Sequence, residues 1–235
     1  MTTIACVLNP SPDFDRDYVE RLRAGVQRNI STRYNFVCLS PFDPGLAGVR
    51  WIKINPRLPG WWAKIELLAL PGPMLYLDLD TVVVGDLDPL VAHIAESKQA
   101  WMLRDLGGGR KLECGVMGWS FPESERFQKL HWRFFNELRE FLPGVGSREQ
   151  AAMRDYDDRV WANDEDWLRA QIGKYGIPVG VLQEQVAGIY SYKLDVERLG
   201  GVPDDAVLIC FHGIPRPRDL AGEKKVPQWL KENWR

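Results

Sequence analysis

Apolar residues come in short blocks along the first hundred residues, and polar residues separate the blocks. The apolar run at residues 3–8 is typical of a buried strand, whereas segment 15–29 has Val19, Leu22 and Val26 at helical spacing. The same patterns predict two more strands and a second helix, at residues 34–39, 49–54 and 62–70. This alternation predicts an α/β fold, in which helices flank a mostly parallel central sheet.

The second half of the chain is less regular. One long helix is expected at residues 123–141, where Phe127, Leu130 and Phe134 fall on a single stripe. Strands are expected at 101–103, 112–119 and 206–211, and Asn163 or Asp164 can cap a short helix. The 235 residues are enough for one sizeable domain, so we expect a single domain over residues 1–235.

Two carboxylates interrupt the apolar run at residues 74–84. Residues two apart in an extended chain point to the same side, so Asp78 and Asp80 are expected to face one way at the end of a buried strand. A bare pair of carboxylates repels itself and loses hydration there, and a hard divalent cation would stabilise it. The pair therefore indicates metal-assisted chemistry on a phosphate-bearing substrate. A polar turn whose aspartates cap backbone N–H groups is the alternative.

A second candidate segment follows the expected late strand. His212 stands directly after the apolar run, and Gly213 and Arg216 come next. Imidazole together with carboxylate oxygens is a ligand set that suits Mn²⁺ better than Mg²⁺. The planar fork of Arg216 is suited to a phosphate. A histidine bonded in the core and a surface arginine are the simpler interpretations of the two residues.

At this point the chain resembles glycosyltransferase family 8, the family of glycogenin and bacterial lipopolysaccharide galactosyltransferases. The segment Tyr76–Val84, which holds the Asp-x-Asp pair, is similar to the metal-binding motif of that family. Four further segments follow in the order of the family, at residues 62–66, 114–117, 163–168 and 211–217. The ordered set is more specific than the Asp-x-Asp pair alone.

The resemblance implies a GT-A fold and retention of anomeric configuration. It implies Mn²⁺, with Mg²⁺ as the alternative, held by Asp78, Asp80 and His212. The donor would be a nucleotide sugar, with a UDP-linked hexose favoured, and the acceptor a hydroxyl on a glycan, lipid or protein. A nucleotide-binding half, a donor-sugar and acceptor half and a tail would span residues 1–100, 101–220 and 221–235.

Further roles are carried over from matching positions. Lys64 would pair with the aspartates or the donor, and Arg216 and Gly213 would contact the donor diphosphate. Asp164 and Glu165 would lie near the sugar as the candidate catalytic residues. A solvent-exposed helix lysine and helix capping, respectively, are the simpler interpretations of Lys64 and the acidic pair.

The chain departs from the family pattern at several of these positions. Glu113 stands where asparagine is usual, Glu165 where glutamine is common, and Arg216 where lysine is usual, with the spacing from His212 shorter by two. These departures indicate a divergent bacterial or phage-like member and leave the donor sugar open.

The composition of the chain argues against several classes of protein. The net charge of −2 argues against a nucleic-acid binder with a basic surface. No apolar stretch reaches membrane-spanning length, and the four cysteines lack zinc-site spacing. Three of the cysteines lie in apolar, strand-like contexts, where a thiol packs as a small hydrophobic group, so we expect a reducing, cytoplasmic setting, with a disulfide between two strand cysteines as the alternative. Lys224, Lys225 and the tail tryptophans could contact a membrane surface, but a short packed helix is favoured.

Three other functions fit parts of the sequence. A metal-dependent phosphohydrolase could use Asp78 and Asp80, but such enzymes carry the motif on their first strand and a second acidic motif after a late strand. A nucleotidyltransferase would need a glycine-rich, basic loop after the first strand, and Asn9-Pro10-Ser11-Pro12 is neither. A catalytically inactive nucleotide-sugar-binding protein would share the fold without turnover. Acceptor recognition is expected around residues 142–158 and the tail.

Overall fold

The computed structural model describes most of the chain. It covers residues 1–9, 11–55, 58, 60–106, 109, 111–141, 163–222 and 226–235. The segment 142–158, predicted to take part in acceptor recognition, and the tail residues Lys224 and Lys225 lie outside the described residues.

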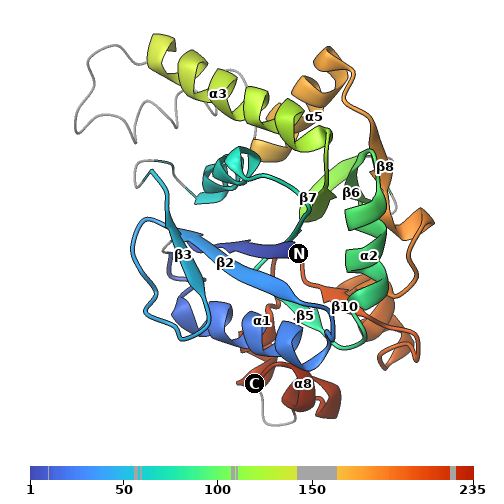
Figure 1. Cartoon of the computed structure of the whole chain (residues 1–235). Coiled ribbons are helices and arrows are strands. Elements are labelled where there is room, and N and C mark those ends of the chain that lie inside the picture. The colour runs from blue at the N-terminus through green and yellow to red at the C-terminus, as the bar shows by residue number, and fades with distance from the viewer. Residues whose placement is uncertain are drawn as a thin grey trace.

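A seven-stranded sheet lies at the centre of the described part, with strand order β3-β2-β1-β4-β7-β6-β8 (Figure 1). Its strands are β1 (Thr2–Val7), β2 (Tyr34–Ser40), β3 (Arg50–Lys53), β4 (Met74–Leu77), β6 (Ala100–Arg104), β7 (Leu112–Trp119) and β8 (Val179–Val181). Neighbouring strands run parallel except at the β4–β7 and β6–β7 pairs. The prediction of an α/β fold with a mostly parallel sheet is confirmed.

Alternate residues of the central strands face two separate cores. In β1, Ile4 and Cys6 enter one core and Ala5 enters the other. In β4, Leu75 and Leu77 join the first core, whereas Met74 and Tyr76 join the second. Both faces of the sheet must therefore be covered, which explains the near-continuous apolar runs of these strands.

Helices and a second sheet cover the two faces (Figure 1). The first core is closed by α1 (Arg16–Arg28), α2 (Asp88–Glu96), the π-helical turn η3 (Tyr192–Val196) and α8 (Gln228–Asn233). The second core is closed by the 3₁₀ helix η1 (Gly60–Ala69), α3 (Glu123–Phe141) and α5 (Asp164–Tyr175). The remaining elements are η2 (Leu182–Glu184), α6 (Glu197–Leu199) and α7 (Pro217–Ala221).

The three-stranded sheet consists of β5 (Thr81–Val83), β10 (Leu208–Cys210) and β9 (Ile189–Ser191), with β10 in the middle. Thr81 of β5 pairs antiparallel with Cys210 of β10. The chain just after β10 therefore runs beside the chain just before β5. This register brings two segments that are more than a hundred residues apart to the same edge of the central sheet.

Two local predictions differ from the structure in detail. The predicted second helix is present, but it is the 3₁₀ helix η1 rather than an α-helix. Trp62, Ile65 and Leu68 recur every third residue and are all buried, which is the repeat of a 3₁₀ helix. The strand predicted to carry the aspartate pair ends at Leu77, and Thr81 N–H bonds back to the Asp78 carbonyl at 3.0 Å, so the pair lies in a turn.

The tail forms the packed helix that was favoured. Leu230 of α8 is buried, and Trp234, just after the helix, packs edge-on against Tyr18 of α1 at 5.4 Å between ring centroids. The guanidinium of Arg21 lies over the Trp234 ring at 4.3 Å. No described helix is both long enough and apolar enough to cross a membrane.

Candidate active site

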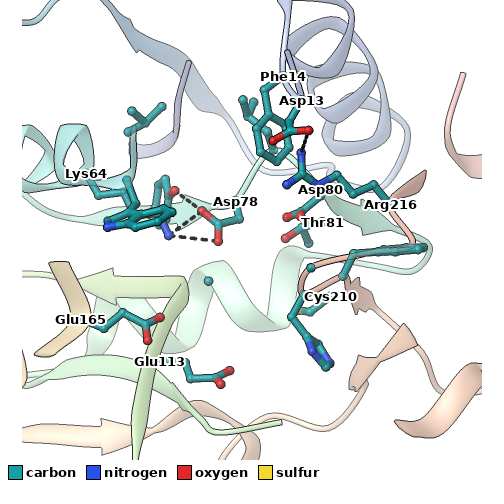
Figure 2. A pocket seen from close by; sticks show the side chains of 18 of the residues that line it. Asp13, Phe14, Lys64, Asp78, Asp80, Thr81, Glu113, Glu165, Cys210 and Arg216 are labelled. Carbon is teal, nitrogen blue, oxygen red and sulfur yellow. Dashed lines mark hydrogen bonds and ion pairs between the residues drawn. The ribbon is translucent and has the colours of Figure 1, made fainter. Parts of the chain in front are cut away.

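One cavity of about 490 Å³ opens at the edge of the central sheet where β1 and β4 end (Figure 2). Segments from both halves of the chain line it. The lining side chains include Asn9, Ser11, Asp13, Phe14, Trp61, Lys64, Tyr76, Asp78, Asp80, Glu113, Glu165, His212 and Arg216. Of the predicted site residues, Asp164 alone is not among those that line the cavity. Gly213 also lines it.

The turn Asp78–Asp80, which we call the aspartate turn, forms one wall of the cavity. Asp78 N–H donates to the Gly115 carbonyl on β7 at 2.9 Å, which fixes the start of the turn. Lys64 reaches both Asp78 oxygens, at 3.0 and 3.1 Å, and the Tyr76 hydroxyl also bonds to Asp78. The pairing predicted for Lys64 is present, so this lysine is not a solvent-exposed surface residue.

Neighbouring charges at the aspartate turn shift one another's pKa values. Burial opposes the positive charge of Lys64, but Asp78 and the groups around it raise the pKa of Lys64 well above its usual range. Burial raises the pKa of Asp80 to about 7, and the neighbouring Asp78 carboxylate adds to that shift. Asp80 is only 7% exposed. The turn therefore places the buried Asp80 beside the partly exposed, ion-paired Asp78, and its backbone is not extended as expected from the sequence.

Arg216 lies on the same side of the cavity as Asp80 (Figure 2). Its Nη1 lies 3.1 Å from the Asp13 carboxylate, and its guanidinium stacks on the Phe14 ring at 4.4 Å. Its Nε is buried and makes no hydrogen bond within the described part of the chain, whereas Nη1 is in the ion pair with Asp13. The arginine is thus held in place by the loop after β1 while donor capacity remains for an anion.

His212 is fixed by the small sheet. Its Nε2 lies 2.7 Å from the Ser191 hydroxyl, and the Ser191 oxygen also accepts the Leu194 N–H at 3.2 Å. Burial lowers the pKa of His212, and the nearby Lys193 lowers it further. The imidazole is therefore neutral at physiological pH, the form in which histidine can bind a metal. Gly213 next to it has a φ of 71°, a conformation that favours glycine.

The three predicted metal ligands share the cavity but do not form a ready-made cluster. Asp78, Asp80 and His212 all line it. Across the described residues, however, no group of three or more histidine, cysteine, aspartate or glutamate side chains is gathered as a metal centre. Two carboxylates and an imidazole are a donor set that fits Mn²⁺ or Mg²⁺ when a substrate supplies further oxygens. The ligand assignment stays a prediction.

Glu113 and Glu165 line the cavity opposite the aspartate turn, and we call this pair the acidic wall (Figure 2). Glu165 lies in the first turn of α5, whose N-cap is Asn163, as predicted. Asp164 is 4% exposed, and its Oδ2 has no hydrogen-bond partner among the described residues. Burial raises the pKa of Asp164 to about 7, although Lys64 opposes the shift.

Several lining residues were not singled out from the sequence. Asp13 and Phe14 follow β1, and Trp61, whose side chain is exposed, precedes Lys64 on η1. The position of Asp13 and Phe14 was detectable in principle, because loops after parallel strands line ligand sites. Glu113 was noted only as a departure from a family pattern. No motif marks Trp61.

Comparison with known proteins yields matches among solved structures only. No protein-family model and no curated protein matches the sequence. The galactosyltransferase LgtC, solved with donor and acceptor sugar analogues, matches with 15% identity over 98% of this chain and 99% of its own, with a TM-score of 0.57. Mouse xyloside xylosyltransferase 1 matches with 11% identity over 91% of this chain and 98% of its own, with a TM-score of 0.51.

The apo form of the glycosyltransferase GlyE from Streptococcus pneumoniae matches with 11% identity and a TM-score of 0.53. The match covers 98% of this chain, which spans 58% of the length of GlyE. At these identities the matches establish the fold. The chain has the GT-A-like fold of family 8 glycosyltransferases over nearly its whole length, as the ordered motifs predicted.

Proposed function

We propose that this protein is a metal-dependent, retaining glycosyltransferase that moves a hexose from a UDP-linked sugar to a hydroxyl acceptor on a glycan, lipid or protein. The observation that carries the proposal is the shared cavity. It combines the aspartate turn, His212 and Arg216 with the acidic wall, at the sheet edge where ligands of α/β folds bind. The glycosyltransferase fold supports the same class of reaction.

The diphosphate would lie between the aspartate turn and Arg216. The buried Nε of Arg216 has no hydrogen-bond partner among the described residues, and the planar fork of the guanidinium matches phosphate oxygens. Lys64 neutralises Asp78, at 3.0 Å, so the turn is not uniformly repulsive toward an anion. Gly213 lets the chain pass close to the donor without a side chain in the way.

A divalent cation would be held by Asp78, Asp80 and His212 together with donor oxygens, with Mn²⁺ favoured over Mg²⁺ because of the imidazole. When bound, such a cation neutralises charge on the departing nucleotide. Asp80 and its neighbour Asp78 would then be paired rather than mutually repulsive. Because Nε2 of His212 bonds to the Ser191 hydroxyl, Nδ1 would be the ring atom that binds the metal.

The sugar would extend toward the acidic wall. Glu165 faces the cavity there, whereas Asp164 is buried behind it, so Glu165 is the better candidate to touch the sugar. Front-side attack by the acceptor and a transient covalent adduct both agree with this placement. Asp164 would act indirectly, through its electrostatic interactions with Lys64 and Glu165.

We also propose a reducing compartment such as the cytoplasm, which agrees with four buried, free cysteines.

A thermal-shift panel tests the proposal. UDP, GDP, ADP and their hexose conjugates are added to the protein with and without Mn²⁺. A ligand that binds only the folded state at 100 times its dissociation constant should raise the melting temperature by about 5–10 °C. We expect UDP and UDP-hexoses to give such shifts with Mn²⁺ and smaller ones after chelation. Equal stabilisation by all nucleotides, or none by UDP, would refute the proposed donor.

A further inference from the structure

The acidic wall brings two carboxylates from separate elements to one side of the cavity. Glu113 lies near the start of β7, and Glu165 lies in the first turn of α5. Both line the cavity, and the charge of Glu165 adds to the effect of burial in raising the pKa of Glu113 (Figure 2). Gly115, two residues after Glu113, lines the space between this wall and Asp78. A Cβ at Gly115 would stand 3.6 Å from Asp78 Oδ2, so backbone alone forms the floor there.

Glu165 is anchored, and Glu113 is much less so. Oε1 of Glu165 accepts the Cys114 N–H at 3.0 Å, and its Oε2 lies 3.5 Å from Arg169 Nη1. Glu113 Oε2 accepts the Leu106 N–H at the longer distance of 3.4 Å. Burial raises the pKa of Glu113 to about 7, and Glu165 and Asp105 add to the rise. Glu113 is therefore a half-buried acid whose neighbouring side chains, Glu165 and Asp105, are themselves acidic.

Among the described residues, three basic side chains around the cavity are already engaged. Lys64 binds Asp78, and Arg169 binds Asp166 and the Leu112 carbonyl as well as Glu165. Arg216 lies with Asp13 on the other side of the cavity. A ligand group that enters between Glu113 and Glu165 thus meets acceptors and negative charge.

On the basis of the proposed function, we propose that Glu113 determines donor specificity: the acidic wall accepts a neutral hexose and rejects a sugar that carries a carboxylate. An ionised carboxylate only accepts hydrogen bonds, and each hexose hydroxyl can donate one. A uronic acid would place a third carboxylate beside Glu113 and Glu165 in a desolvated space, where like charges repel strongly. The preference for a hexose over a uronic acid would come from this charge repulsion as much as from hydrogen bonds to the hexose hydroxyls.

Calorimetric titration with matched ligand pairs tests the inference. UDP-glucose and UDP-glucuronate differ only at C6, as do UDP-galactose and UDP-galacturonate. Each is titrated, along with UDP alone, into the whole protein in the presence of Mn²⁺ at pH 8, where Glu113 is largely ionised. For the better-bound hexose, we expect the matching uronate to bind at least about tenfold more weakly.

Glu113→Gln removes the charge and keeps the shape. We expect this variant to reduce the hexose-to-uronate ratio by about tenfold while the affinity for UDP alone is unchanged. Glu184→Gln is the matched control, because it changes the net charge equally at a side chain that pairs with Arg104 outside the cavity. The control should keep the wild-type ratio.

The possible failures are distinguishable. If wild type binds UDP but binds uronates as tightly as hexoses, the specificity inference is wrong and the proposed function stands. An unchanged ratio in Glu113→Gln overturns the role of that residue in the same way. If UDP itself fails to bind, the proposed function fails and the specificity inference fails with it. The wild-type comparison tests whether the cavity rejects uronates even if the variant does not fold.

Discussion

The aspartate turn and the acidic wall face each other across one cavity, and both are built from carboxylates, yet their surroundings differ. At the turn, Lys64 binds Asp78 directly, and Arg216 lies close to Asp80. At the wall, Glu113 accepts the Leu106 N–H, and the side chains that raise its pKa, Glu165 and Asp105, are acidic. Mixed charge suits a metal and a diphosphate, whereas unbalanced acceptors suit hydroxyl groups. The comparison teaches that the charge around a carboxylate, more than its presence, indicates which part of a substrate it can hold.

The largest effect is expected from Asp164, a buried carboxylate next to the acidic wall that makes the stability of the protein depend on pH. The ordinary pKa of Asp164 is 3.8, and burial raises it to about 7 in the folded protein. Between these values the folded state binds more protons than the unfolded state, so stability falls as pH rises. From pH 5 to pH 8 this residue should cost about 3 kcal/mol.

Asp164→Asn should remove that loss, because asparagine does not titrate. Chemical unfolding of wild type and variant at pH 5 and pH 8 measures the difference. Asp80 and Glu113, whose pKa values are also raised to about 7, should leave some pH dependence in the variant. An equal fall in the free energy of unfolding for both proteins would show that ionisation of Asp164 does not destabilise the folded protein.

A smaller effect is expected at the other side of the cavity. Arg216→Ala removes a guanidinium with buried donors, and we expect UDP to bind about 10- to 100-fold more weakly. Arg216→Lys should lie between, since it keeps the charge but loses the planar fork. Arg218→Ala is the matched control, because Arg218 pairs with Asp15 at 2.6 Å and does not line the cavity. Equal losses for Arg216→Ala and Arg218→Ala would indicate a general effect on the loop.

Much of the fold could be predicted because local signals agree with each other. The predicted helix at 123–141 matches α3, and Asp15 and Asn163 accept capping bonds at the starts of α1 and α5. The 3₁₀ helix was not predicted, because the spacing of three between Ile65 and Leu68 occurs in both kinds of helix and the adjacent Ala69 also fits the α-helical repeat. The break at Asp78–Asp80 was also missed, since the apolar residues of β5 continue the pattern of β4.

The residues of the candidate site were likewise predicted only in part. Lys64, Asp78, Asp80, Glu165, His212, Gly213 and Arg216 were all expected, and all line the cavity. Asp164 does not line it, because this first residue of α5 is buried in the protein. Asp13 and Trp61 belong to no motif, and only the pairing of distant strands brings them to the same cavity. Their roles depend on tertiary packing, which a local pattern does not encode.

The most direct measurement is the release of UDP from a UDP-hexose by wild type and Asp80→Asn in the presence of Mn²⁺. Asp80 is buried beside Asp78 at the centre of the proposed metal site. The account predicts that Asp80→Asn lowers the rate at least about 100-fold while the melting temperature is kept or raised, because a desolvated charge is removed. Asp204→Asn, at an exposed aspartate outside the cavity, should behave like wild type. Undiminished release of UDP by a folded Asp80→Asn protein would contradict the account.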